Sequence, residues 1–132
     1  MKFPYIERES RIFGSILKPI IDIEILSEKY GLWCGIESVL VDTGADITLI
    51  PSSIGKGLVD DLYSGTKAAI KGITPFELIV YIHNLKVRVA NKEFETKVAI
   101  ADSDDVPAVL GRFRALDIFD ARFVRGQEIV LE

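Results

Sequence analysis

Hydrophobic and polar residues alternate over most of this chain, which is the pattern of strands that bury one face. In residues 19–26, for example, Ile21, Ile23 and Ile25 alternate with two acidic residues. The last segment, residues 126–132, has the same character and is expected to form a terminal strand. The pattern therefore predicts a mostly β architecture built from short strands.

A second strand is expected to run over residues 30–41. This strand is expected to run through Cys34, Ile36, Ser38 and Leu40. Its last three residues, 39–41, are apolar on both faces, so the strand should be fully buried where it ends. An acidic residue, Asp42, follows this buried run directly.

Residues 85–100 predict a hairpin of two antiparallel strands. The first strand places Leu85, Val87 and Val89 on one face, and the turn is expected at residues 91–93. The positions expected to share a face of the second strand are Phe94, Thr96, Val98 and Ile100. Both strands therefore have one face available for a core.

Helical spacing is limited to two short segments. Pro51 and the serines after it are expected to open a helix of one or two turns, which Gly57 closes. Residues 112–120 place apolar side chains at i, i+3 and i+6, which predicts one definite helix near the C-terminus. The length of 132 residues fits a single domain over residues 1–132 with a real core.

Composition narrows the classes of function. Apolar residues make up 48% and charged residues 27% of the chain, as in globular proteins. The net charge of −4 and the scattered basic residues argue against nucleic acid as a partner. Cys34 is the single cysteine, and no apolar run has the length of a signal peptide core or a membrane span. The sequence therefore predicts a cytoplasmic protein without a membrane partner.

The run VLVDTGAD, at residues 39–46, carries the strongest chemical signal. A carboxylate at the end of a buried strand is costly unless hydrogen bonds or another charge stabilise it. Thr43 offers a hydroxyl, Gly44 permits a sharp turn and exposes its N–H, and Ala45 allows close approach. Asp42 is therefore a candidate catalytic carboxylate, and the alternative is an Asx turn that only ends the strand.

This run resembles the catalytic loop of the retropepsin-like, or retroviral-type, aspartic proteases. A second run, PAVLGR at residues 107–112, is similar to the apolar-apolar-Gly-Arg segment that leads into the C-terminal helix of that family. The resemblance spans residues 17–125 and leaves residues 1–16 as an N-terminal arm without an assigned role. It implies an all-β acid protease barrel with one short C-terminal helix, which is one lobe of a C2 dimer.

The resemblance also implies an activity, that of an aspartic endopeptidase acting on polypeptide substrates with no metal or organic cofactor. Because the chain has one Asp-Thr-Gly and is too short for two lobes, the second aspartate would come from another copy in a homodimer. The two Asp42 carboxylates would share one proton and activate a water. The alternative is a catalytically silent, dimeric peptide-binding module with the same fold.

The same resemblance assigns roles to neighbouring positions. Thr43 would hydrogen-bond across the dimer axis beneath the carboxylates, and Gly44 would meet the substrate backbone. Asp46 would lie at the edge of the cleft and pair with Arg112, which would hold two loops together. The residues expected to bind substrate are Ala45, Asp46, Gly72 and Ile73, and those expected to support the site are Gly111 and Arg112.

A flap over the cleft is expected at residues 69–76, with the sequence AIKGITPF. Gly72 would form a mobile tip, and the flap would exclude water and hold the peptide by main-chain hydrogen bonds. Three apolar residues near the expected site, Ile47, Ile73 and Leu110, suggest tolerance for apolar side chains around the cut.

Structural roles are favoured for three other groups. The acidic residues Asp102, Asp104 and Asp105 lack the spacing of a calcium loop, and a solvated turn is expected. His83 is the only histidine and has no second His or Cys in its vicinity to complete a zinc site. Cys34 is expected to be a small core residue. No metal site is therefore predicted.

Overall fold

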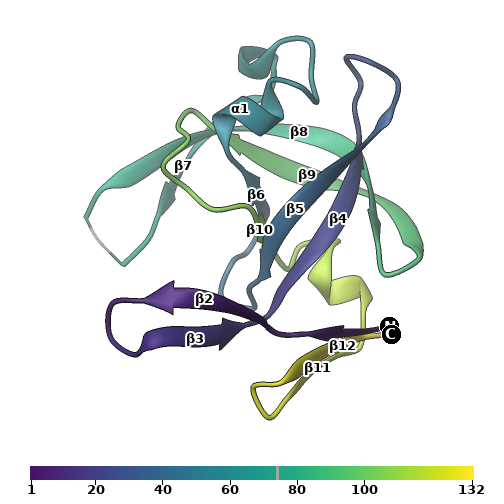
Figure 1. The fold of residues 1–132 in the computed structure, drawn as a ribbon. Coiled ribbons are helices and arrows are strands. Elements are labelled where there is room, and N and C mark those ends of the chain that lie inside the picture. Colours follow the sequence, from purple (N-terminus) through teal and green to yellow (C-terminus); the bar gives the residue numbers. More distant parts are fainter. Residues whose placement is uncertain (74) are drawn as a thin grey trace.

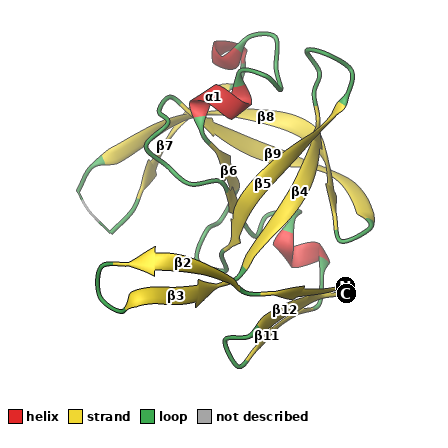
Figure 2. Cartoon of the chain, in the orientation of Figure 1, coloured by secondary structure: helices red, strands yellow, loops and turns green. Residues whose placement is uncertain are grey.

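A computed structural model describes residues 1–73 and 75–132 of the chain (Figures 1 and 2). Within these residues, the largest element is a seven-stranded sheet. Its strands are β4 (Ile20–Leu26), β5 (Trp33–Val41), β6 (Thr48–Ile50), β7 (Thr66–Lys71), β8 (Glu77–Val89), β9 (Lys92–Ala101) and β10 (Val109–Leu110). They are ordered β4-β5-β10-β6-β9-β8-β7, and an additional pairing of β4 with β8 closes the sheet into a barrel. The predicted all-β barrel is confirmed.

Two smaller sheets hold the ends of the chain. Their strands are β1 (Lys2–Pro4), β2 (Ile6–Ser10), β3 (Gly14–Lys18), β11 (Ala121–Val124) and β12 (Glu128–Leu131). The first strand of the chain, β1, pairs with the last strand, β12, which also pairs with β11. Strands β2 and β3 form a separate hairpin below the barrel (Figure 1). The expected terminal strand is therefore present, and most of residues 1–16 lie in strands.

Alternating apolar residues fill the barrel as the sequence predicted. Ile21, Ile23 and Ile25 of β4 are all buried. The hairpin of β8 and β9 is also confirmed, and it turns at Ala90 and Asn91, one residue before the expected turn. Both turn residues have positive φ, at 48° and 67°. Such a two-residue turn matches the twist of the two strands that it joins.

A β-bulge near the end of β5 changes which side chains face the core. Between the paired positions Ile21–Val39 and Ile23–Ile36, β5 has two residues where β4 has one, and Ser38 has a φ of 58°. The extra residue reverses the alternation, so Val39 is buried and Ser38 is exposed. The expected strand through these residues is confirmed, and strict alternation along it does not allow for the bulge at Ser38.

Helical structure is sparse in the described residues. The helix expected after Pro51 is present as α1 (Ser52–Gly55), and a 3-10 turn, η1 (Leu62–Ser64), follows it. The helix expected over residues 112–120 is shorter, because only η2 (Leu116–Ile118) forms, as a 3-10 turn. No helix in the described part of the chain is long and apolar enough to cross a membrane.

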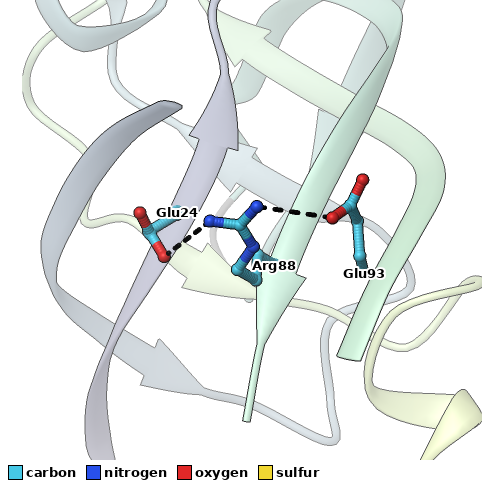
Figure 3. A network of polar contacts seen from close by, with 3 residues as sticks. All are labelled: Glu24, Arg88 and Glu93. Carbon is cyan, nitrogen blue, oxygen red and sulfur yellow. Dashed lines mark hydrogen bonds and ion pairs between the residues drawn. The ribbon is translucent and has the colours of Figure 1, made fainter. Parts of the chain in front are cut away.

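One polar cluster lies where the barrel closes. Arg88 of β8 pairs with Glu24 of β4 and with Glu93 of β9, each at 3.4 Å (Figure 3). Its guanidinium also lies 3.9 Å from the centre of the Trp33 ring. Such a stacked cation helps to hold the strands together. Because all three charged side chains are partly exposed, each ion pair contributes little, on the order of 0–1 kcal/mol.

Candidate functional site

The candidate catalytic residue, Asp42, comes directly after β5 and is held between two other segments. Strand β10 runs parallel to β5, and the Leu110 carbonyl accepts a hydrogen bond of 3.2 Å from the Asp42 N–H. On the other side of β5, the Pro19 carbonyl accepts a 2.9 Å bond from the Val41 N–H. The backbone at Asp42 is therefore fixed from both sides by buried strands.

The loop after β5 orients the Asp42 carboxylate. The Gly44 N–H donates to Asp42 Oδ1 at 2.8 Å, and the Ala45 N–H donates to the Asp42 carbonyl at 3.2 Å. A Cβ atom at position 44 would lie 3.2 Å from Asp42 Oδ1, which is a crowded contact. The carboxylate is half-buried, and Thr43 beside it is exposed. The predicted N–H donor is therefore present, and it forms an Asx turn.

The Asx turn agrees with both interpretations of Asp42, as a catalytic carboxylate and as a residue that only ends the strand. An Asx turn explains how the carboxylate is oriented, and a catalytic carboxylate needs to be oriented as well. What distinguishes the site is the cleft on which Asp42 lies, since a residue that only ends a strand has no need of a cleft.

The second motif, PAVLGR at residues 107–112, packs through Gly111 against the residues that follow the Asp42 loop. Gly111 follows β10, and its N–H donates to the hydroxyl of the fully buried Thr48 at 3.1 Å. A Cβ atom at position 111 would collide with the backbone of Ile47. Gly111 is therefore required by the close approach of two backbones, which agrees with its expected supporting role.

The expected ion pair between Asp46 and Arg112 is absent from the structure. The Arg112 guanidinium instead contacts Asp117, with Nε at 3.3 Å from Oδ1, because the turn after Gly111 folds back on itself. The two loops are joined through their backbones: the Arg112 N–H donates to the Ala45 carbonyl and the Phe113 N–H to the Asp46 carbonyl, both at 2.9 Å. The predicted ion pair is therefore wrong, and backbone hydrogen bonds join the two loops in its place.

The segment expected to form the flap is a hairpin. Strand β7 pairs with the first half of β8, and the last pair joins Lys71 to Glu77. Gly72 and Ile73 lie at the tip, and Thr74 lies outside the described residues. The hairpin extends from the barrel beside the Asp42 loop (Figure 1).

The Asp42 loop and this hairpin face each other across a cleft of about 490 Å³. Its lining residues are Asp42, Gly44, Ala45, Asp46, Ile47, Leu49, Ala69, Ile70, Lys71, Gly72 and Val109. The cleft therefore unites four predicted site residues of the loop with Gly72 of the hairpin. Ile73 is fully exposed at the tip, and Leu110 is fully buried, so neither lines the cleft.

The sequence analysis did not identify two lining residues of the sheet, and it placed two others in the expected flap without giving them a role in binding. Leu49 and Val109 come from the paired strands β6 and β10, while Ile70 and Lys71 come from β7. The expected flap over residues 69–76 already contained Ile70 and Lys71, so the sequence held a usable signal for these two. The positions in β6 and β10 required knowledge of which strands pair.

The other candidate residues have structural roles. Asp104 accepts a 2.7 Å hydrogen bond from the Ser53 N–H at the start of α1, which lowers the pKa of its carboxyl below the ordinary value. His83 Nε2 lies 2.8 Å from the Leu62 carbonyl. Cys34 is half-buried at the edge of the core. In the described residues, no group of three or more His, Cys, Asp or Glu could hold a metal ion.

Comparison with known proteins identifies structural relatives. No family model matches the sequence, and no curated protein matches it. A retropepsin-like aspartic protease from Rickettsia conorii superimposes with a TM-score of 0.60 at 19% identity, covering 99% of this chain and 92% of that one. The EIAV protease in complex with the inhibitor HBY-793 gives a TM-score of 0.49 at 21% identity, covering 72% of this chain and 82% of that one. The chain therefore shares its fold with the Rickettsia conorii structure.

Proposed function

We propose that this chain, which has the retropepsin-like aspartic protease fold, is an aspartic endopeptidase that works as a homodimer of single-domain subunits. The observation that carries the proposal is the position of Asp42, whose carboxylate is fixed by the Gly44 N–H in the cleft that faces the β7–β8 hairpin. A carboxylate that is held rigidly and reached from a cleft meets the geometric requirement for a general base.

A single carboxylate is half of the required site. The chain contains one Asp-Thr-Gly sequence, so the second carboxylate would be Asp42 of the partner subunit. Two carboxylates so close cannot both ionise, and they would share one proton.

The reaction then needs only the two carboxylates and water. The ionised Asp42 takes a proton from the water, whose oxygen attacks the carbonyl carbon of the peptide bond. The protonated Asp42 of the partner subunit donates its proton to the carbonyl oxygen, which gives a neutral tetrahedral diol. Asp42 then gives its proton to the amide nitrogen, and the ionised Asp42 of the partner subunit takes a proton from one hydroxyl of the diol. The carbon–nitrogen bond breaks, a carboxylic acid and an amine are released, and the pair again holds one proton.

The cleft fits an extended polypeptide. The β7–β8 hairpin would act as the flap, and the substrate would lie as an added strand between it and the Asp42 loop, held by main-chain hydrogen bonds. The larger apolar residues that line the cleft are Ile47, Leu49, Ile70 and Val109. They favour apolar substrate side chains beside the cut. Asp46 and Lys71 add one charge of each sign at the cleft.

The proposal is tested by proteolysis of an unfolded protein over a range of pH. Asp42→Asn keeps the shape of the side chain and removes its ionisation, so kcat/KM is expected to fall at least ~100-fold, since positioned acid–base groups contribute that much. Asp60→Asn is the control for the same chemical change, because Asp60 is an exposed aspartate that does not line the cleft. Cleavage that persists undiminished in Asp42→Asn would refute the protease. If the wild type and Asp42→Asn both bind a peptide and neither cleaves it, the result would favour the catalytically silent binding module.

A further inference from the structure

The hairpin of β2 and β3 has no role in the site described above, yet it exposes apolar residues that a partner could bury. All five residues of β3 are exposed, and within the described residues the hairpin pairs with no third strand. Two large apolar residues occupy its tip, where Ile12 is 84% and Phe13 is 70% exposed. Turns normally carry polar residues and glycine, and an isolated two-stranded hairpin is at best marginally stable in water. These features indicate a surface that another molecule covers.

The base of the hairpin is attached next to the catalytic residue. Pro19 follows β3 directly, and its carbonyl accepts the hydrogen bond from the N–H of Val41, the residue before Asp42. Arg8 of β2 donates to the Ser38 hydroxyl at 3.0 Å, in the bulge of the strand that carries Asp42. The orientation of the hairpin is therefore tied to β5.

This attachment places the hairpin near the two-fold axis of the proposed dimer. Two Asp42 carboxylates that share a proton must lie beside that axis. Adjacent strands are about 4.8 Å apart, so the base of the hairpin lies on the order of 10 Å from the axis. Five residues of strand extend about 17 Å, which is enough to pass the axis. The hairpin tip points to the same side of the barrel as the tip of the β7–β8 hairpin over the cleft (Figure 1).

We propose that the β2–β3 hairpin is a dimerisation arm, which reaches across the two-fold axis and packs its Ile12 and Phe13 side chains on the second copy of this chain. The inference rests on the proposed function, because the incomplete Asp42 site supplies the reason for a second copy. In a C2 dimer both arms make the same contact, so the assembly buries two apolar tips. The arm thereby contributes to assembly of the active site without touching the substrate.

The experiment measures the dimer dissociation constant of the full chain by analytical ultracentrifugation. The double substitution Ile12→Ser, Phe13→Ser is expected to raise this constant at least tenfold, because burial of two large apolar side chains favours association. Leu32→Ser is the matched control, because Leu32 is 65% exposed in the loop between β4 and β5, at the other end of the barrel (Figure 1). Thermal unfolding at a concentration where both variants are monomeric checks that the fold of each is unchanged.

The outcomes for the arm and for the protease are separable. A tenfold weakening in the tip variant with no change in the control supports the arm, whether or not the wild-type chain cleaves a substrate. A dissociation constant within twofold of wild type overturns the arm and leaves the protease standing. A wild-type chain that is monomeric at every concentration overturns both. A benzophenone photocrosslinker in place of Phe13 adds a direct test, since the arm predicts covalent dimers and an arm lying on its own subunit gives crosslinks within one chain.

Discussion

Asp42 illustrates how one hydrogen bond can serve two purposes. The Gly44 N–H that completes an Asx turn also holds one carboxylate oxygen and leaves the other able to meet water. A Cβ at position 44 would crowd that oxygen. Gly44 therefore matters for the position of the carboxylate as much as for the turn. For this reason the three residues Asp42, Thr43 and Gly44 are informative about the site although the motif is short.

Thr48 is expected to be important for stability although it is not a catalytic residue. Its hydroxyl is fully buried and accepts the Gly111 N–H, so Thr48→Val would leave a buried N–H without its acceptor. Such a loss costs about 1–3 kcal/mol. Chemical denaturation of the two proteins measures the difference, with Thr66→Val at the exposed start of β7 as the control. Equal free energies of unfolding for Thr48→Val and the wild type would contradict the role given to this hydroxyl.

Arg112 is expected to contribute little through its side chain. Its pair with Asp117 is exposed, and exposed ion pairs contribute about 0–1 kcal/mol. Arg112→Ala should therefore lower the free energy of unfolding by less than about 1 kcal/mol, while the backbone bonds to Ala45 and Asp46 persist. A double-mutant cycle with Asp117→Ala isolates the pair. Coupling of Arg112 with Asp46 and not with Asp117 would show that the ion pair expected from the sequence forms in solution.

At the scale of elements, α1 depends on a residue far away in the chain. Asp104 accepts the Ser53 N–H, and this bond lowers the pKa of its carboxyl. A group whose pKa is lower in the folded state stabilises the protein above its unfolded pKa, and this contribution is lost as pH falls through the folded pKa. Asp104→Ala should therefore reduce the melting temperature near neutral pH and progressively less as pH falls below about 4. Asp105→Ala is the control. A reduction in melting temperature that is the same at every pH would contradict the role given to the hydrogen bond between Ser53 and Asp104.

The sequence predicted the parts of the fold that follow from a local pattern of residues, and it did not predict those that depend on pairing between distant strands. Alternation identified β4 and the β8–β9 hairpin, because each buries one face and the alternation follows from strand geometry. It failed at Ser38, where a bulge shifts the alternation, and at β1, which pairs with the far end of the chain. The β2–β3 hairpin was missed because its apolar residues do not face the core of its own subunit. At the site, the motif identified the Asp42 loop, whereas Val109 and Leu49 became neighbours only through strand pairing.

At the scale of the whole molecule, the barrel brings the two motifs together by a parallel pairing. Strand β10 enters between β5 and β6, which places the end of the second motif beside Asp42. The same arrangement leaves Asp42 half-buried in the wall of the cleft. Under the proposed function, this arrangement would be half of a two-fold site, and its chemistry would depend on assembly.

This dependence predicts that an inactive chain suppresses an active one. When wild-type chains are mixed with a ninefold excess of Asp42→Asn chains and allowed to exchange, random pairing leaves about one tenth of the wild-type chains in wild-type dimers. The activity per wild-type chain should then fall about tenfold, because a mixed dimer holds one ionisable carboxylate. The measurement is the initial rate of proteolysis after exchange, with an equal excess of an unrelated protein as the control. An undiminished rate would mean that each chain is active alone, and it would refute the shared site.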